Sequence, residues 1–215
     1  MCNRFSINNS FKNLWTTLHL PPKDSSTFHV CYNIVPGENV PIIHFQENQA
    51  KVTLMKWGLI PQLHSLENKV RFINAESENI HHKSFFRNLI IQNRCLIPMS
   101  GFYEWDHKTV PHQPYYFYLP YRKLFAIAGI WNATEIKGEV VYTFAVLTTQ
   151  ANFNVGCVHN RMPIIITPAD HQRWLEDASF NINNLALPPP LYFYKISPKI
   201  NDPHINEISL IHPLT

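Results

Sequence analysis

The chain has 215 residues, a length that fits one large domain better than two. Hydrophobic residues make up 45% of the sequence and charged residues only 15%, so a core can form and a disordered or linker protein is excluded. The net charge of +3 and the pI of about 8.6 permit nucleic-acid binding without arguing for it. The four widely spaced cysteines predict neither a disulfide scaffold nor a zinc site.

The amino-terminal segment lacks an apolar signal core, and the sequence contains no apolar run of about 18 residues. We therefore expect a soluble protein in a reducing compartment, the cytoplasm, associated with the nucleoid if the host is a bacterium. A monomer is expected.

The first half of the chain predicts one helix, several short strands and a second helix. Apolar residues recur at helical spacing over residues 10–19, and Pro21 and Pro22 end that helix. Short β-like runs, separated by turn residues, then predict strands at residues 27–33, 41–45 and 51–57. A second amphipathic helix is predicted over residues 76–92.

The second half of the chain is strongly β-like. Apolar and aromatic runs predict strands at residues 94–98, 100–105, 114–120, 123–131, 140–149 and 191–197. Thr167 followed by Pro168 predicts the start of a third helix, and residues 186–190 form a proline-rich bridge. The predicted fold is α+β: a single β-rich domain over residues 2–215, with a mixed or antiparallel sheet and short flanking helices. Its core covers about residues 2–201, and an irregular carboxyl-terminal tail follows.

Cys2 can supply two nucleophiles once Met1 has been removed. An α-amine has a pKa of about 7.7–8.0, so roughly a fifth of such amines are uncharged near neutral pH and can attack an aldehyde. The adjacent thiol can then close onto the imine carbon and form a five-membered thiazolidine ring. An internal cysteine cannot do this, because its nitrogen is an amide. The alternative is that Cys2 merely follows the initiator.

Two further residues suggest a site, although each has a structural explanation. Asn74 lies at the predicted entrance to the second helix, where it could simply cap that helix while the following glutamates complement its dipole. Glu104 is framed by Phe102, Tyr103 and Trp105, apolar neighbours that would raise its pKa and suit it to proton transfer. It could equally be the outward-facing residue of an alternating strand.

His159, Arg161 and Trp57 complete the candidates. His159 can hold or move a proton, and Arg161 can hold a phosphate. Trp57 could stack on a nucleobase, although a tryptophan in the core is the ordinary reading.

Together these segments resemble the SRAP family, the "SOS response-associated peptidases", which are understood as abasic-site processing proteins. The resemblance runs from Cys2 to about Asn201, and the order of the motifs is more specific than any one of them. The matching segments are residues 1–5 (MCNRF), 32–36 (YNIVP), 56–61 (KWGLIP), 73–75 (INA), 94–98 (RCLIP), 101–105 (GFYEW) and 159–163 (HNRMP).

The resemblance implies a β-rich domain with a positively charged cleft for single-stranded DNA. It implies that Cys2 crosslinks to the abasic site, that Asn74 orients the reacting sugar and that Glu104 moves protons. His159 would help to open the deoxyribose and assist reversal of the crosslink. The family's peptidase activity implies that the protein removes its own Met1. The expected product is a thiazolidine that protects the strand during replication-coupled repair in the SOS response.

The resemblance also implies a set of DNA-binding positions. Arg4 and Arg161 match positions that hold the phosphates beside the lesion, and Trp57 matches an aromatic residue at the edge of the cleft. The family usually has arginine where this chain has Glu76, a change that removes one phosphate contact and adds repulsion. Arg71 is a candidate substitute for it. We therefore expect weaker or more salt-sensitive DNA binding with the crosslinking chemistry intact.

The expected partner is single-stranded DNA that contains abasic sites, with replication-fork proteins as further candidates, and no metal, organic cofactor or membrane is implied. Two alternatives remain open. One is an amino-terminal-nucleophile amidohydrolase, in which the Cys2 thiol attacks an amide; such chains usually continue with glycine, whereas this one has Asn3. The other is a non-catalytic single-strand-binding protein that uses aromatic stacking.

Overall fold

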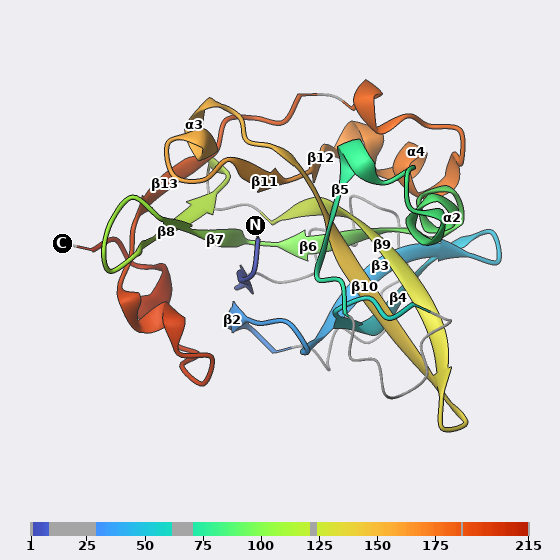
Figure 1. The fold of residues 1–215 in the computed structure, drawn as a ribbon, viewed down its shortest axis with the longest axis horizontal. Coiled ribbons are helices and arrows are strands. Elements are labelled where there is room, and N and C mark those ends of the chain that lie inside the picture. The colour runs from blue at the N-terminus through green and yellow to red at the C-terminus, as the bar shows by residue number, and fades with distance from the viewer. Residues whose placement is uncertain (1, 9–28, 62–70, 121–123, 186, 215) are drawn as a thin grey trace.

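A computed structural model describes residues 2–8, 29–61, 71–120, 124–185 and 187–214, which form one α+β domain built mainly of strands (Figure 1). The helix predicted over residues 10–19 lies outside the described residues. Within the described residues no helix is both long and apolar enough to cross a membrane.

A five-stranded antiparallel sheet carries the amino terminus. Its strand order is β13-β8-β7-β1-β2. The short strand β1 lies between β7 and β2, so the first residues of the chain are fixed between two neighbours. The bounds are β1 Phe5–Ile7, β2 Cys31–Ile34, β7 Gly101–Asp106, β8 Gln113–Tyr118 and β13 Tyr192–Lys195.

The second sheet closes on itself. Its strand order is β11-β10-β4-β3-β6-β9-β12, and pairing between β9 and β10 completes a ring of β10, β4, β3, β6 and β9. Strand β10 runs parallel to β4 and to β5 and antiparallel to β9 and β11, so the sheet is mixed. The bounds are β3 Asn39–Gln46, β4 Gln49–Trp57, β5 Asn74–Glu76, β6 Arg94–Met99, β9 Phe125–Ile136, β10 Glu139–Gln150, β11 Arg161–Pro163 and β12 Ile165–Ile166.

The helices are short and lie at the edges of the sheets (Figure 1). Thr167 and Pro168 begin the third predicted helix as expected, although the Thr167 side chain makes no capping hydrogen bond. The tail contains two 3-10 turns and is otherwise irregular. The helices and 3-10 helices are η2 Ser77–Asn79, α2 Ser84–Gln92, α3 Phe153–Gly156, η4 Pro168–Asp170, α4 His171–Glu176, η5 Ile182–Asn184, η6 Pro198–Asn201 and η7 Ile208–Ile211.

The predicted helix over residues 76–92 is wrong in its first half. Asn74–Glu76 forms β5, which pairs in parallel with β10, and the α-helix begins only at Ser84. The hydrogen bonds that β10 offers are non-local, so the amphipathic pattern of residues 76–92 could not reveal them.

The main hydrophobic core lies between the two sheets and inside the closed ring. Strand β9 is buried over most of its length and β10 over its central residues 143–148, in keeping with the near-continuous apolar runs of the sequence. The buried guanidinium of Arg94 donates to the carbonyl oxygens of Ile90, Asp177, Ala178 and Phe180, and thus ties α2 to the segment after α4.

Candidate functional site at the amino terminus

Strand β1 carries Cys2 to the side of Glu104. Phe5 pairs with Phe102 of β7, and the backbone N–H of Tyr103 donates to the carbonyl oxygen of Arg4 at 3.0 Å. Two residues further toward the amino terminus, Cys2 is fully buried, and its Sγ lies 3.9 Å from the carbonyl oxygen of Arg4. Burial, together with the negative charge of Glu104, raises the pKa of the Cys2 thiol. The thiol is therefore held in its neutral form.

Asn74 approaches Cys2 from the other sheet. Because β5 pairs with β10, the Asn74 side chain points back toward the amino terminus, and its Nδ2 donates to the carbonyl oxygen of Cys2 at 3.1 Å. Its Oδ1 is buried and accepts no hydrogen bond from the residues that the structure describes. Asn74 therefore fixes the Cys2 backbone and retains an acceptor for a further hydroxyl or amine.

Glu104 is a buried carboxyl group on β7. Its residue is only 2% exposed, and burial raises its pKa to about 7. The rings beside it are themselves fixed: the Tyr103 hydroxyl donates to the carbonyl oxygen of Tyr32 at 2.6 Å, and Trp105 Nε1 donates to Asn201 Oδ1 at 2.8 Å. Glu104 can therefore accept and return a proton near neutral pH in a rigid setting.

A cavity of about 260 Å³ opens beside these groups. Its lining comes from the amino-terminal segment, from β7 and the turn after it, and from the carboxyl-terminal segment: Asn3, Arg4, Glu104, Trp105, His107 and Asn201. The cavity thus lies beside Asn3, the residue that follows Cys2, and Glu104 reaches it from β7.

His159 lies near this cavity, in the turn between α3 and β11. Its ring centroid is 6.0 Å from that of His107, and burial lowers its pKa. The backbone N–H of Arg161 donates to His159 Nδ1 at 3.0 Å. The same Nδ1 lies 3.2 Å from the carbonyl oxygen of Arg161, so the backbone of Arg161 holds the ring of His159 through Nδ1.

Trp57 is not at the edge of a cleft, and that prediction is wrong. The side chain is fully buried, its ring packs 4.9 Å from the ring of Phe5, and its Nε1 donates to the carbonyl oxygen of Ile73. Its position at the end of β4, beneath β1, places the ring in the core. Trp57 therefore supports the strand that carries Cys2 and cannot stack on a base.

Arg4 contacts the protein itself. Its Nη1 donates to Asn33 Oδ1 at 2.8 Å and to the carbonyl oxygen of Ile200 at 3.1 Å, and its Nη2 donates to that of Asn201 at 3.4 Å. The side chain thus connects β1, β2 and the carboxyl-terminal segment at the rim of the cavity. Its predicted contact with phosphate remains a prediction.

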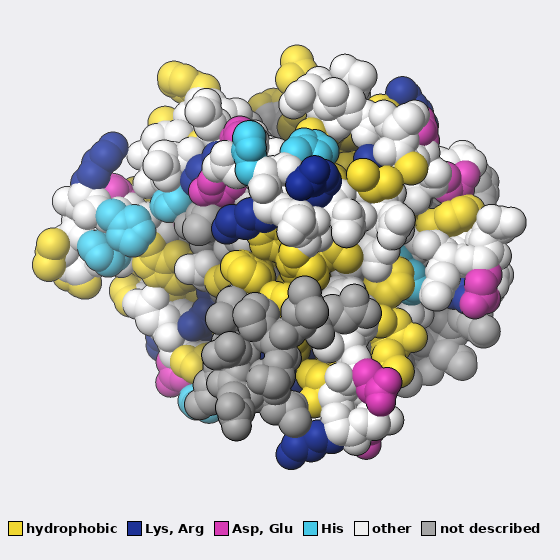
Figure 2. All heavy atoms as spheres, turned by 45° about the vertical axis from the view of Figure 1, so that its right-hand side comes forward, with side chains coloured by type: hydrophobic (Ala, Val, Ile, Leu, Met, Phe, Trp, Pro, Cys, Tyr) yellow, Lys and Arg dark blue, Asp and Glu magenta, His cyan; other side chains and the backbone are white. Residues whose placement is uncertain are grey.

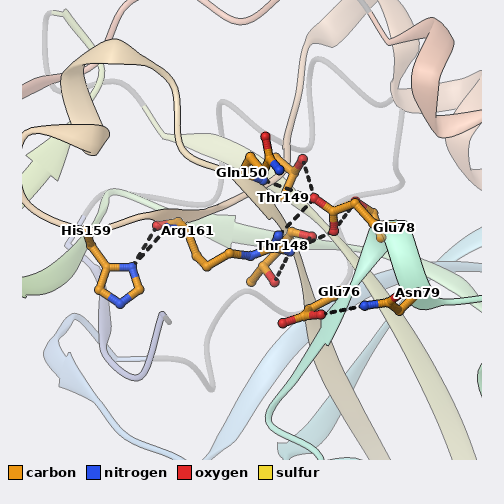
Figure 3. Close-up of polar contacts among 9 residues, drawn as sticks. Glu76, Glu78, Asn79, Thr148, Thr149, Gln150, His159 and Arg161 are labelled. Carbon is orange, nitrogen blue, oxygen red and sulfur yellow. Dashed lines mark hydrogen bonds and ion pairs between the residues drawn. The ribbon is translucent and has the colours of Figure 1, made fainter.

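Arg161 is paired with an acid that the sequence analysis did not single out. Its Nη1 and Nη2 each donate to one carboxylate oxygen of Glu78 at 2.9 Å (Figure 3). The position of Arg161 in the HNRMP motif suggested a contact with phosphate. No local pattern predicts that an acid 83 residues away in the sequence is its partner. His107 was also missed, since a histidine in a strand-connecting turn carries no signal of its own.

Arg71 and Glu76 are exposed. Arg71 directly precedes Phe72, whose backbone pairs with that of Leu59, and Glu76 accepts a hydrogen bond from Asn79 Nδ2 at 2.8 Å. On the face shown in Figure 2, basic, acidic and histidine side chains lie intermixed around hydrophobic ones in the described part of the chain. This mixture agrees with the small net charge of +3. No group of three or more His, Cys, Asp or Glu side chains among the described residues is placed to hold a metal ion.

A fully buried second-position cysteine thus lies beside an asparagine amide that hydrogen-bonds its carbonyl oxygen and near a carboxyl group of raised pKa. The chain belongs to the SOS response associated peptidase (SRAP) family, whose model matches residues 1–203.

Relatives support this placement over the whole chain. The abasic site processing protein YoqW of Bacillus subtilis is 30% identical over 98% of this chain and 99% of its own. The abasic site processing protein HMCES of Xenopus tropicalis is 27% identical over 71% of this chain and 56% of its own. A crystal structure of a Bacteroides thetaiotaomicron protein, 26% identical, covers 100% of both chains with a TM-score of 0.85.

Proposed function

We propose that this protein processes abasic sites in single-stranded DNA by forming a covalent crosslink through Cys2. The observation that carries the proposal is the convergence of Cys2, Asn74 and Glu104 from two different sheets beside a polar cavity. Relatives named abasic site processing proteins supply the substrate class. In the cell the crosslink would protect the strand during replication-coupled repair and the SOS response.

The reaction begins with loss of Met1, because only then is the Cys2 nitrogen an amine. We propose that the protein hydrolyses this peptide bond itself, in keeping with the family's description as peptidases. The free amine then adds to the aldehyde carbon of the opened sugar. Loss of water gives an imine, and the Cys2 sulfur adds to the imine carbon while its proton passes to the nitrogen. The product is a thiazolidine, which contains no imine to promote strand cleavage.

The neighbouring residues have distinct roles in this scheme. Glu104, with a pKa of about 7, takes up and returns the protons of addition and dehydration. His159, whose ring borders the cavity through His107, is the proposed proton donor that opens the closed sugar when its imidazole is protonated. The open acceptor of Asn74 holds the sugar hydroxyl group. Arg4, Arg71 and Arg161 are the candidate phosphate contacts.

The test uses single-stranded DNA in which one uracil has been converted to an abasic site. Wild-type protein should give a heat-stable shifted band on a denaturing gel, and Cys2→Ala should give none. Cys2→Ser and Cys2→Ala both keep the α-amine once Met1 is removed but lack the thiol, so each should give at most a labile adduct that borohydride traps. Crosslinking by Cys2→Ala at the wild-type level would disprove the assignment of Cys2.

A further inference from the structure

Glu78 gathers several hydrogen-bond donors around one carboxylate (Figure 3). Besides the two bonds from Arg161, Oε1 accepts from the backbone N–H of Gln150 at 3.2 Å and from the Thr149 hydroxyl at 3.4 Å. Arg161 Nη2 also donates to the carbonyl oxygen of Thr148 at 2.8 Å. Hydrogen bonds therefore attach both members of the ion pair to the last residues of β10.

The pair joins the two segments that carry Asn74 and His159. Glu78 belongs to η2, which follows β5 and therefore Asn74 directly. Arg161 begins β11, and its own backbone N–H holds His159 Nδ1. The two segments lie on opposite sides of β10, which pairs with both β5 and β11. A displacement of Arg161 would thus move the turn that orients His159.

The geometry distinguishes this pair from an ordinary surface ion pair. The bond is bidentate, and the Arg161 side chain is only 14% exposed, against 40% for Glu78. The Arg161 guanidinium lowers the pKa of Glu78 to about 2, so the pair stays charged throughout the neutral range. The carboxylate is a fixed part of the fold at any pH where the protein would act.

We infer that Glu78 is a positioning residue for the proposed crosslinking reaction, acting through Arg161 on the orientation of His159. This inference rests on the proposed function, because its kinetic test measures the rate of crosslinking. It assigns Glu78 no contact with DNA. A carboxylate beside a polyanion opposes binding, so removing it should leave the affinity for DNA unchanged or raise it. The rate of the chemical step should instead fall, because a proton donor displaced by about 1 Å can lose about a hundredfold in rate.

The experiment compares Glu78→Gln and Glu78→Ala with wild-type protein. Affinity is measured by fluorescence anisotropy on an intact single strand, and the crosslinking rate constant is measured at saturating abasic DNA. Glu139→Gln is the matched control, since it removes the same charge from the exposed end of β10. We expect both Glu78 variants to bind at least as tightly as wild type. The rate constant should fall at least tenfold in Glu78→Ala and less in Glu78→Gln, which keeps one acceptor oxygen.

Two results would overturn the inference. One is a wild-type rate constant in Glu78→Ala; the other is a parallel loss of affinity, rate and unfolding midpoint, which would mean general damage to the fold. Histidine-selective ¹⁵N NMR gives a readout that needs no crosslink. The ¹⁵N signals of His159, assigned by their loss in His159→Asn, report the tautomer of the ring and the hydrogen bonding of Nδ1 to the Arg161 backbone, and these signals should shift in Glu78→Ala. If wild type forms no crosslink, the proposed function fails, whereas an unchanged His159 spectrum in the variant would refute the positioning role alone.

Discussion

At the scale of single residues, the raised pKa of Glu104 suits this carboxyl group to proton transfer and also lowers the stability of the folded protein at neutral pH. Its pKa is about 7 in the folded protein and 4.5 in an ordinary setting, because burial disfavours its charged form. The folded state therefore binds the proton more tightly than the unfolded state does. Stability falls as pH rises from about 4.5 to about 7 and then levels off, and the difference corresponds to roughly 3 kcal/mol.

Glu104→Gln should remove this pH dependence, because an amide does not ionise. Relative to wild type, the variant should gain about 3 kcal/mol in the free energy of unfolding between pH 4 and pH 8. Urea denaturation of both proteins at the two pH values measures the gain. A constant difference between the two proteins at both pH values would show that the folded-state pKa of Glu104 is not raised.

The sequence pointed to the residues of the proposed reaction more clearly than to the residues that support them. Cys2 and Glu104 could be named because their local surroundings, a free terminus and an aromatic frame, already carry the chemistry. The burial of Trp57 and the pairing of Arg161 with Glu78 depend on contacts between distant segments, which local patterns do not encode.

At the scale of secondary-structure elements, continuous apolar runs were reliable, whereas the amphipathic pattern over residues 76–92 predicted a helix correctly only in its second half. The runs that predicted β6, β9 and β10 are buried strands, since burial on both faces leaves a strong local signal. Strand β5 has only three residues and shows no such run. Its extended conformation depends on pairing with β10, which a local pattern does not reveal. Asn74 was expected at a helix entrance and instead lies on a strand, which is what directs its amide to Cys2.

At Gly101, the first residue of β7, the neighbouring strand leaves no room for a side chain. A Cβ added there would lie 2.3 Å from Cζ of Tyr116 and 2.6 Å from the carbonyl oxygen of Phe117. Gly101→Ala should therefore push β8 away from β7 and cost about 2–4 kcal/mol of stability.

Gly156→Ala is the control for this substitution, because nothing lies within 4 Å of a Cβ at that position in α3. It should change the free energy of unfolding by less than about 1 kcal/mol. Thermal or chemical unfolding of the two variants checks the difference, and equal stabilities would contradict the close packing of β7 on β8.

At the scale of the whole molecule, the electrostatic attraction to DNA is expected to be weak. The net charge is only +3, and the exposed Glu76 stands where a basic residue would favour a phosphate. Glu76→Arg should tighten binding to single-stranded DNA and steepen the dependence of log K on log salt by about 0.7, the value for one added phosphate contact.

Glu139→Arg makes the same change of charge at the β9–β10 hairpin, which projects away from the amino terminus in Figure 1. It should leave the salt dependence close to that of wild type. Anisotropy titrations at several salt concentrations separate the two variants, and equal slopes would mean that Glu76 lies away from the bound strand.

The covalent bond between Cys2 and the sugar is the claim on which the functional account depends. Mass spectrometry of a proteolysed crosslink, formed without any reductant, tests it most directly. We predict an amino-terminal peptide that begins at Cys2, lacks Met1 and carries the deoxyribose remnant with the loss of one water, on a residue whose thiol no longer reacts with alkylating reagents. A remnant on a lysine, or on a peptide that still begins with Met1, would contradict the account.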